Sequence, residues 1–163
     1  MGKSEDSLCG IIICTCNAAM IFQDPASAEL IAEYERECAN PLLGPCAPQP
    51  EMYASLEEQG AAQCFAAYKD QTLIGFAFVL TTPLPHYELE RKFATVESFF
   101  VASVARHTGC GRYLMEGVEN YCRAVQCEAI FFSVPVNTRL ARLMLMSGDK
   151  YTNTGHIFCR GLR

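Results

Sequence analysis

The sequence has little charge and no long apolar segment. Only 19% of its 163 residues are charged, whereas 50% are hydrophobic. A chain with this balance can bury a core, which excludes an intrinsically disordered protein. No apolar run approaches the roughly 18 residues that a membrane-spanning helix needs, so we expect no membrane association. Residues 1–7 mix both charges without an apolar stretch, unlike a secretion signal, and we expect a cytoplasmic protein.

Basic residues are also scarce. The chain has 13 Lys and Arg against 18 Asp and Glu, which gives a formal net charge of −5. Sequence-independent binding of nucleic acid needs clustered Lys and Arg, so we expect no nucleic-acid partner.

Metal-ligand and disulfide spacings are absent, although the chain has ten cysteines. The three histidines, His86, His107 and His156, have no matched ligand spacing, and there is no C-x-x-C pair. We therefore expect reduced thiols that act as small hydrophobic residues, and no metal site. A cysteine-rich redox or metal protein is the competing interpretation, which thiol titration and metal analysis would test.

Apolar periodicity and turn residues predict a single domain over residues 1–163 with mixed secondary structure. Asp24-Pro25 is typical of a helix start, and Asn40-Pro41 of a helix end. The patterns predict strands at 8–16, 63–68, 73–81, 94–102, 129–134 and 156–159, and helices at 25–39, 51–59, 109–126 and 138–146. The resulting order, β-α-α-β-β-β-α-β-α-β, predicts an α+β fold in three layers, with helices on the faces of a central sheet.

One segment carries a motif with a chemical meaning. The strand that ends near Val101 leads into a short loop, and Gly109 and Gly111 then open a helix. The first turn of a helix offers unpaired N–H groups, and glycine lets the backbone approach an anion closely. Arg106 and Arg112 add cationic donors on either side, so this segment predicts a phosphate site. It is neither a dinucleotide fingerprint nor a P-loop, because the required third glycine and the Gly-Lys-Ser/Thr run are missing.

Arg106-x-x-Gly109-x-Gly111 after a strand resembles the acyl-CoA motif of the GNAT N-acetyltransferase superfamily, R/Q-x-x-G-x-G/A. The helix that follows Asn137 is similar to the next helix of that family, and the predicted element order matches the family's mostly antiparallel sheet. The resemblance implies an enzyme that transfers an acetyl group from acetyl-CoA to a primary amine by direct attack on the thioester. It implies cofactor contacts from the following residues: Phe99, Phe100, Val101, Arg106, His107, Thr108, Gly109, Cys110, Gly111, Arg112 and Asn137.

Direct transfer needs a base that takes a proton from the amine. Glu97 is the candidate, because strand alternation would place its side chain on the same face as Thr95 and Phe99, beside the expected thioester site. A surface carboxylate is the competing interpretation. His86, Glu88 and Glu90, in the preceding loop, could instead shape the acceptor site.

Two features leave alternatives open. Met144 stands where many family members have a tyrosine that protonates the leaving thiolate, and Tyr151 is the nearest substitute. A GNAT-fold module that binds acyl-CoA without turnover is therefore the second hypothesis. Cys110 could act as a nucleophile, but the sequence places no base beside it. The amine acceptor, whether a small molecule or a protein, cannot be read from the sequence, and the oligomeric state stays open, a homodimer included.

Overall fold

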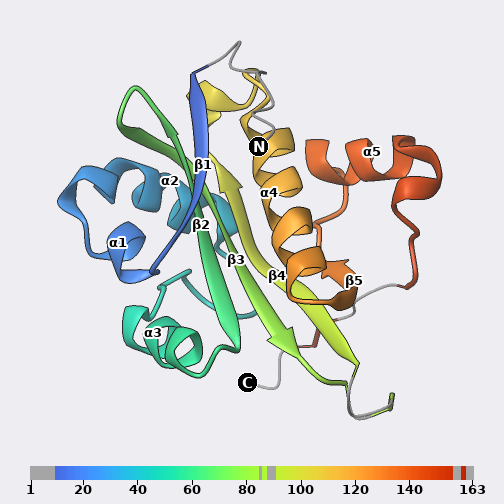
Figure 1. The fold of residues 1–163 in the computed structure, drawn as a ribbon. Helices are drawn as coiled ribbons and strands as arrows, with labels where there is room; N and C mark the ends of the chain where they lie inside the picture. Colours follow the sequence, from blue (N-terminus) through green and yellow to red (C-terminus); the bar gives the residue numbers. More distant parts are fainter. Residues whose placement is uncertain (1–9, 85, 88–90, 156–158, 161–163) are drawn as a thin grey trace, which may run out of the picture.

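The computed structural model describes residues 10–84, 86–87, 91–155 and 159–160. Five strands form one sheet in the order β1 (Ile11–Cys16), β2 (Ala62–Lys69), β3 (Thr72–Thr82), β4 (Lys92–Val101) and β5 (Cys127–Phe132). Strands β1 to β4 pair antiparallel with one another, and β5 runs parallel to β4 (Figure 1). The parallel pair needs a crossover, which the helix α4 (Cys110–Ala124) provides.

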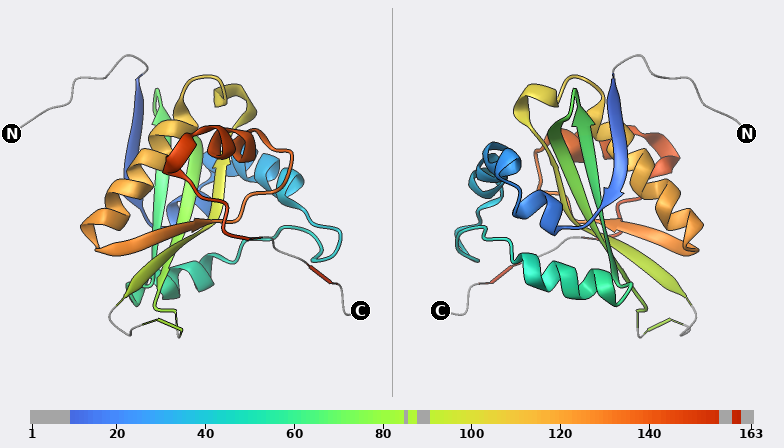
Figure 2. Two further views of the ribbon diagram at one scale, coloured as in Figure 1. Left: turned by 90° about the vertical axis from the view of Figure 1, so that its right-hand side faces the viewer. Right: turned by 60° about the vertical axis from the view of Figure 1, so that its left-hand side comes forward.

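Helices cover both faces of this sheet (Figure 2). One face carries α1 (Ala19–Phe22), α2 (Ala28–Cys38) and α3 (Pro50–Glu58), and the other carries α4. The last helix, α5 (Arg139–Met146), follows β5 and precedes a short turn, η3 (Gly148–Lys150). Two further short turns, η1 (Pro25–Ser27) and η2 (Ser103–Ala105), precede α2 and α4. The predicted three-layer α+β fold is therefore confirmed.

Buried side chains form the core on both faces of the sheet, and residues of β3 contribute to it. Phe76 and Phe78 are fully buried under the α1 to α3 layer, where their rings contact Tyr34 and Tyr53. On the opposite face, Gly117 lets α4 approach β1 so closely that a Cβ atom there would lie 2.9 Å from Ile13 Cγ2. The two packed faces fix where the ends of β4 and α4 lie, and these ends form the candidate site.

Most predicted elements are present, with shifted ends. The helix predicted at 25–39 begins as the short turn η1, in which the Asp24 side chain accepts a hydrogen bond from Ala26 N, and it continues as α2. The hairpin turns at Asp70 and Gln71, which both have positive φ, as a two-residue turn between β2 and β3 requires. Residues 156–158 of the strand predicted at 156–159 lie outside the described residues. No described helix is long and apolar enough to cross a membrane.

Candidate active site

The loop between β4 and α4 presents a set of free backbone N–H groups. Gly109 is the N-cap of α4 and has φ +85°, a conformation that glycine adopts without strain. The amides of His107, Gly109, Gly111 and Arg112 have no hydrogen-bond acceptor among the described residues. Unpaired amides at the positive end of a helix dipole favour an anion, so the geometry fits a phosphate group.

The Arg106 side chain contacts protein groups that lie away from these amides. Its Nε donates to Val101 O at 3.0 Å, and its Nη2 lies 2.7 Å from Glu37 Oε2 and 3.5 Å from Glu33 Oε1. The guanidinium also lies over the Phe100 ring at 5.5 Å. Arg106 therefore joins the loop to α2, and the two carboxylates offset its charge.

Arg139, which the sequence analysis missed, brings a second arginine to the loop. From the first turn of α5 its Nη1 donates to Arg106 O at 3.2 Å and lies 3.1 Å from His107 Nδ1. No carboxylate pairs with Arg139 in the part of the chain that the structure describes. The only sequence signal was its position two residues after Asn137, and nothing in the pattern predicted the contact with a loop 32 residues away.

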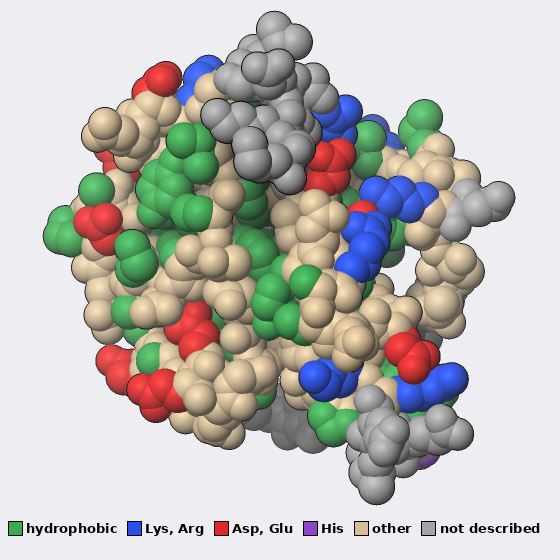
Figure 3. Space-filling model, viewed as in Figure 1, with side chains coloured by type: hydrophobic (Ala, Val, Ile, Leu, Met, Phe, Trp, Pro, Cys, Tyr) green, Lys and Arg blue, Asp and Glu red, His purple; other side chains and the backbone are tan. Residues whose placement is uncertain are grey.

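The edge of β4 beside this loop is open. The pairing with β5 ends at Val96 and Phe132, so within the described residues 97–101 have no partner on that side. The surface is hollowed between α4 and α5 (Figure 3). Phe99 is half-buried, whereas Phe100 and Val101 are buried. This open edge leaves backbone groups of residues 97–101 available to an extended ligand.

A β-bulge at Glu97 corrects one prediction. Phe78 pairs with Ser98, whereas the next residue of β3 pairs with Val96, so Glu97 is an extra residue in β4. The extra residue breaks the alternation on which the prediction rested. The Glu97 side chain bonds to Tyr53 on the α1 to α3 face, whereas Phe99 lies within 4.0 Å of a Cβ atom built on Gly111, on the α4 face. The expectation that Glu97 and Phe99 share a face was wrong.

The remaining predicted residues lie at or near the loop. Thr108 Oγ1 donates to Ala105 O at 2.7 Å and stabilises the turn. Arg112 is exposed, and its Nε lies 3.6 Å from Glu116 Oε1. Cys110 is fully buried, and burial raises the pKa of its thiol to about 11, which argues against a nucleophile. Asn137 is exposed with φ +66°, and the neighbouring Thr138 caps α5 by accepting from Ala141 N.

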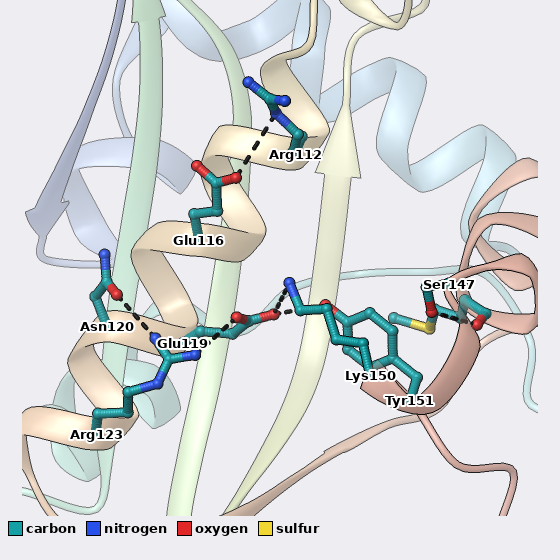
Figure 4. Close-up of polar contacts among 9 residues, drawn as sticks. Arg112, Glu116, Glu119, Asn120, Arg123, Ser147, Lys150 and Tyr151 are labelled. Atoms are coloured by element: carbon teal, nitrogen blue, oxygen red, sulfur yellow. Dashed lines mark hydrogen bonds and ion pairs between the residues drawn. The ribbon is translucent and has the colours of Figure 1, made fainter. Parts of the chain in front are cut away.

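Tyr151, the substitute considered for the missing tyrosine, is held by α4 (Figure 4). Its hydroxyl donates to Glu119 Oε1 at 2.5 Å, and its ring packs against Phe132. Burial and the negative charge of Glu119 raise the pKa of Tyr151. Its hydroxyl proton is therefore engaged in a structural bond.

Part of the predicted acceptor loop lies within the described residues. His86 is exposed, and the neighbouring Glu88 and Glu90 lie outside the described residues. Among the residues that the structure describes, no three His, Cys, Asp or Glu side chains are grouped so that they could hold a metal ion.

Comparison with known proteins identifies the family. Residues 28–146, which include the β4 to α4 loop and α5, match the profile of the acetyltransferase (GNAT) family. The chain belongs to the GNAT acetyltransferase family. No curated protein sequence matches it.

Solved acetyltransferase structures have the same fold at low identity. Ribosomal-protein-alanine N-acetyltransferase from Brucella melitensis biovar Abortus 2308 is 16% identical, with a TM-score of 0.66 over 93% of this chain and 99% of that one. An aminoglycoside acetyltransferase from an uncultured soil metagenomic sample, in complex with sisomicin, is 15% identical, with a TM-score of 0.68 over 93% and 96% of the two chains. An acetyltransferase from Trypanosoma brucei is 11% identical, with a TM-score of 0.63 over 91% and 99%. At these identities the likeness establishes the fold alone.

Proposed function

We propose that this GNAT protein is an acetyl-CoA-dependent N-acetyltransferase that acts on a primary amine. The observation that carries the proposal is the turn of free amides at Gly109 and Gly111, placed at the end of the open edge of β4. The amides fit a diphosphate, and the open edge fits the extended arm that joins a diphosphate to a thioester. Acetyl-CoA would supply the acetyl group as an activated thioester.

Different residues of the chain would bind different parts of acetyl-CoA. The amides of His107, Gly109, Gly111 and Arg112 would hold the diphosphate, and Arg139 would add a charged donor beside them. The backbone of Phe99 to Val101 would bond to the extended arm. An N–H group of this strand aimed at the thioester oxygen would stabilise the negative charge that develops there during attack.

Glu97 would take the proton from the attacking amine. Glu97 is exposed at the β4 bulge, directly after Val96, where the pairing of β4 with β5 ends. An acceptor can therefore reach its carboxylate from solvent. A neutral amine nitrogen would then attack the thioester carbon, and the CoA thiolate would leave. The acceptor class of the structural relatives, an aminoglycoside or a protein amine, is consistent with an anionic base.

Binding of acyl-CoA without turnover is the second candidate. By the family resemblance, Met144 stands where many members have a tyrosine, and Tyr151 donates to Glu119. These two observations leave the proton donor to the thiolate without an assigned residue. Turnover with any amine would exclude this alternative.

The test combines acetyl-CoA with a panel of primary amines and follows free thiol release. Glu97→Gln should lower kcat by about 10²–10⁴-fold, because a positioned base has this effect, and should leave CoA affinity unchanged. Glu58→Gln, an exposed glutamate at the end of α3, is the matched control and should retain full activity. Full turnover by Glu97→Gln would show that Glu97 is only a surface carboxylate, and CoA binding without thiol release would favour the second candidate.

A further inference from the structure

Two hydroxyl groups converge on one oxygen of Glu97. Tyr53, on α3, donates to Glu97 Oε2 at 3.3 Å, and the neighbouring Ser98 donates to the same oxygen. Ser98 in turn accepts a hydrogen bond from Tyr34, on α2, at 3.2 Å. Three different elements of the fold therefore contribute to the position of this carboxylate.

The other oxygen, Glu97 Oε1, has no donor among the described residues. Ser98 is 4% exposed, whereas Glu97 is classed with the exposed residues, so the network lies at the buried side of the carboxylate. With Oε2 held by donors from the protein, Oε1 is the oxygen that remains open to a ligand. The arrangement orients the carboxylate as well as anchoring it.

The Tyr53 hydroxyl is held in place by packing of its ring. The ring stacks on Phe22 with centroids 5.2 Å apart and meets Phe78 edge-on at 4.1 Å. Burial, followed by the negative charge of Glu97, raises the pKa of Tyr53 to about 12. Tyr53 therefore keeps its proton, and remains a donor, throughout the neutral range.

We propose that Tyr53 is a positioning residue for the catalytic base, fixing the Glu97 carboxylate so that Oε1 receives the proton of the acceptor amine. This inference rests on the proposed function. It assigns to α3 a role that neither the GNAT motif nor the sequence pattern gives it. Other titratable groups lie around the Glu97 carboxylate. Those facing it from the packed elements are Tyr34 and Cys38 of α2, Cys46 of the following loop, and Tyr53 itself.

The kinetic test compares Tyr53→Phe with Tyr34→Phe. Both variants keep the ring, but only Tyr53→Phe removes a direct donor to the carboxylate. Tyr53→Phe should lower kcat about 10-fold, because the carboxylate loses the hydrogen bond that fixes its orientation. The KM for acetyl-CoA should not change. Tyr34→Phe should lower kcat by less, since it acts only through Ser98.

A second measurement needs no turnover. In protein labelled with ¹³C at glutamate carboxyl carbons, the Glu97 resonance is assigned by its loss in Glu97→Gln. The chemical shift of this resonance at neutral pH should change in Tyr53→Phe, because the carboxylate loses a donor, and should change less in Tyr34→Phe. A role in packing alone would lower the melting temperature and leave both kcat and this resonance unchanged, which would overturn the proposal. Failure of the proposed function would be distinct, since wild-type protein would then release no thiol whatever the Glu97 resonance shows.

Discussion

Glu119 joins α4 to the C-terminal part of the chain, and its removal should destabilise the fold in a pH-dependent way. Its side chain is only 8% exposed and accepts from Tyr151 at 2.5 Å, while Lys150 Nζ lies at 3.0 Å and Arg123 Nη2 at 3.1 Å (Figure 4). These groups line a cleft of about 260 Å³ between α4, β5 and η3. We expect Glu119→Gln to weaken the contacts that hold the segment around Tyr151 against α4.

The size of the effect follows from the partners. A hydrogen bond to a charged acceptor contributes about 1.5–3 kcal/mol, against about 1 kcal/mol for a neutral one, so weakening the Tyr151 bond costs about 0.5–2 kcal/mol. Lys150 and Arg123 are more than half exposed, and solvent limits each of these pairs to about 0.2–1 kcal/mol. Glu119→Gln should therefore lower the free energy of unfolding by about 1–4 kcal/mol at pH 7.

The sign of the pH dependence is fixed by the charge. Burial alone would raise the pKa of Glu119, but bonds from Tyr151, Lys150 and Arg123 outweigh it, and the pKa is lowered. A depressed pKa stabilises the fold above the unfolded value and loses that contribution as pH falls through the folded value. The difference between wild type and Glu119→Gln should therefore shrink between about pH 5 and about pH 3.

Urea denaturation followed by circular dichroism measures both quantities. Glu116→Gln is the matched control, because Glu116 lies on the same helix in an exposed pair with Arg112, and it should change stability by less than about 0.5 kcal/mol. Equal stability of Glu119→Gln and wild type at pH 7 would refute the reasoning. A difference that does not change on acidification would refute the electrostatic part of it.

Three further variants test the packing and the loop. Gly75→Ala would place a Cβ atom 2.8 Å from the backbone oxygen of Phe100, and it should destabilise the protein by about 1–3 kcal/mol in thermal denaturation. Gly155→Ala is the control, because a Cβ atom there would have no neighbour within 4 Å, and it should not destabilise the protein. Arg106→Ala should lower stability by about 1–2 kcal/mol through lost contacts to α2 and β4, with little loss of CoA affinity in calorimetry. Arg139→Ala should weaken CoA binding about 3–10-fold with little change in stability; the reverse ranking of these two arginines would contradict their assigned roles.

Local sequence signals predicted much of the fold. The Asp24-Pro25 start of the first long helical segment and the glycine at the start of α4 were both readable, because they reflect backbone requirements that few residues satisfy. The apolar stripe of α4 was readable because it has helical periodicity and lies against the sheet. The same local reasoning pointed to the β4 to α4 loop, whose free amides the structure shows.

Features that depend on register and on distant contacts were not predictable. The bulge at Glu97 depends on how β3 and β4 pair, and a single extra residue moved the carboxylate to the face opposite Phe99. The carboxylates that pair with Arg106 come from α2, about 70 residues earlier, and no local pattern indicated them. Tyr53 and Arg139 reach the site from separate elements, and neither belongs to a local motif.

The most direct test of the central claim is a calorimetric titration of acetyl-CoA into wild type, Gly109→Ala and Gly60→Ala. Both glycines have positive φ, +85° and +65°, so both substitutions introduce comparable backbone strain, but only Gly109 lies at the free amides. Wild type and Gly60→Ala should bind about one acetyl-CoA per chain, and Gly109→Ala should bind at least 10-fold more weakly, about 1.4 kcal/mol. Absence of binding by wild type, or unchanged affinity in Gly109→Ala, would contradict the assignment of this loop as the acetyl-CoA site.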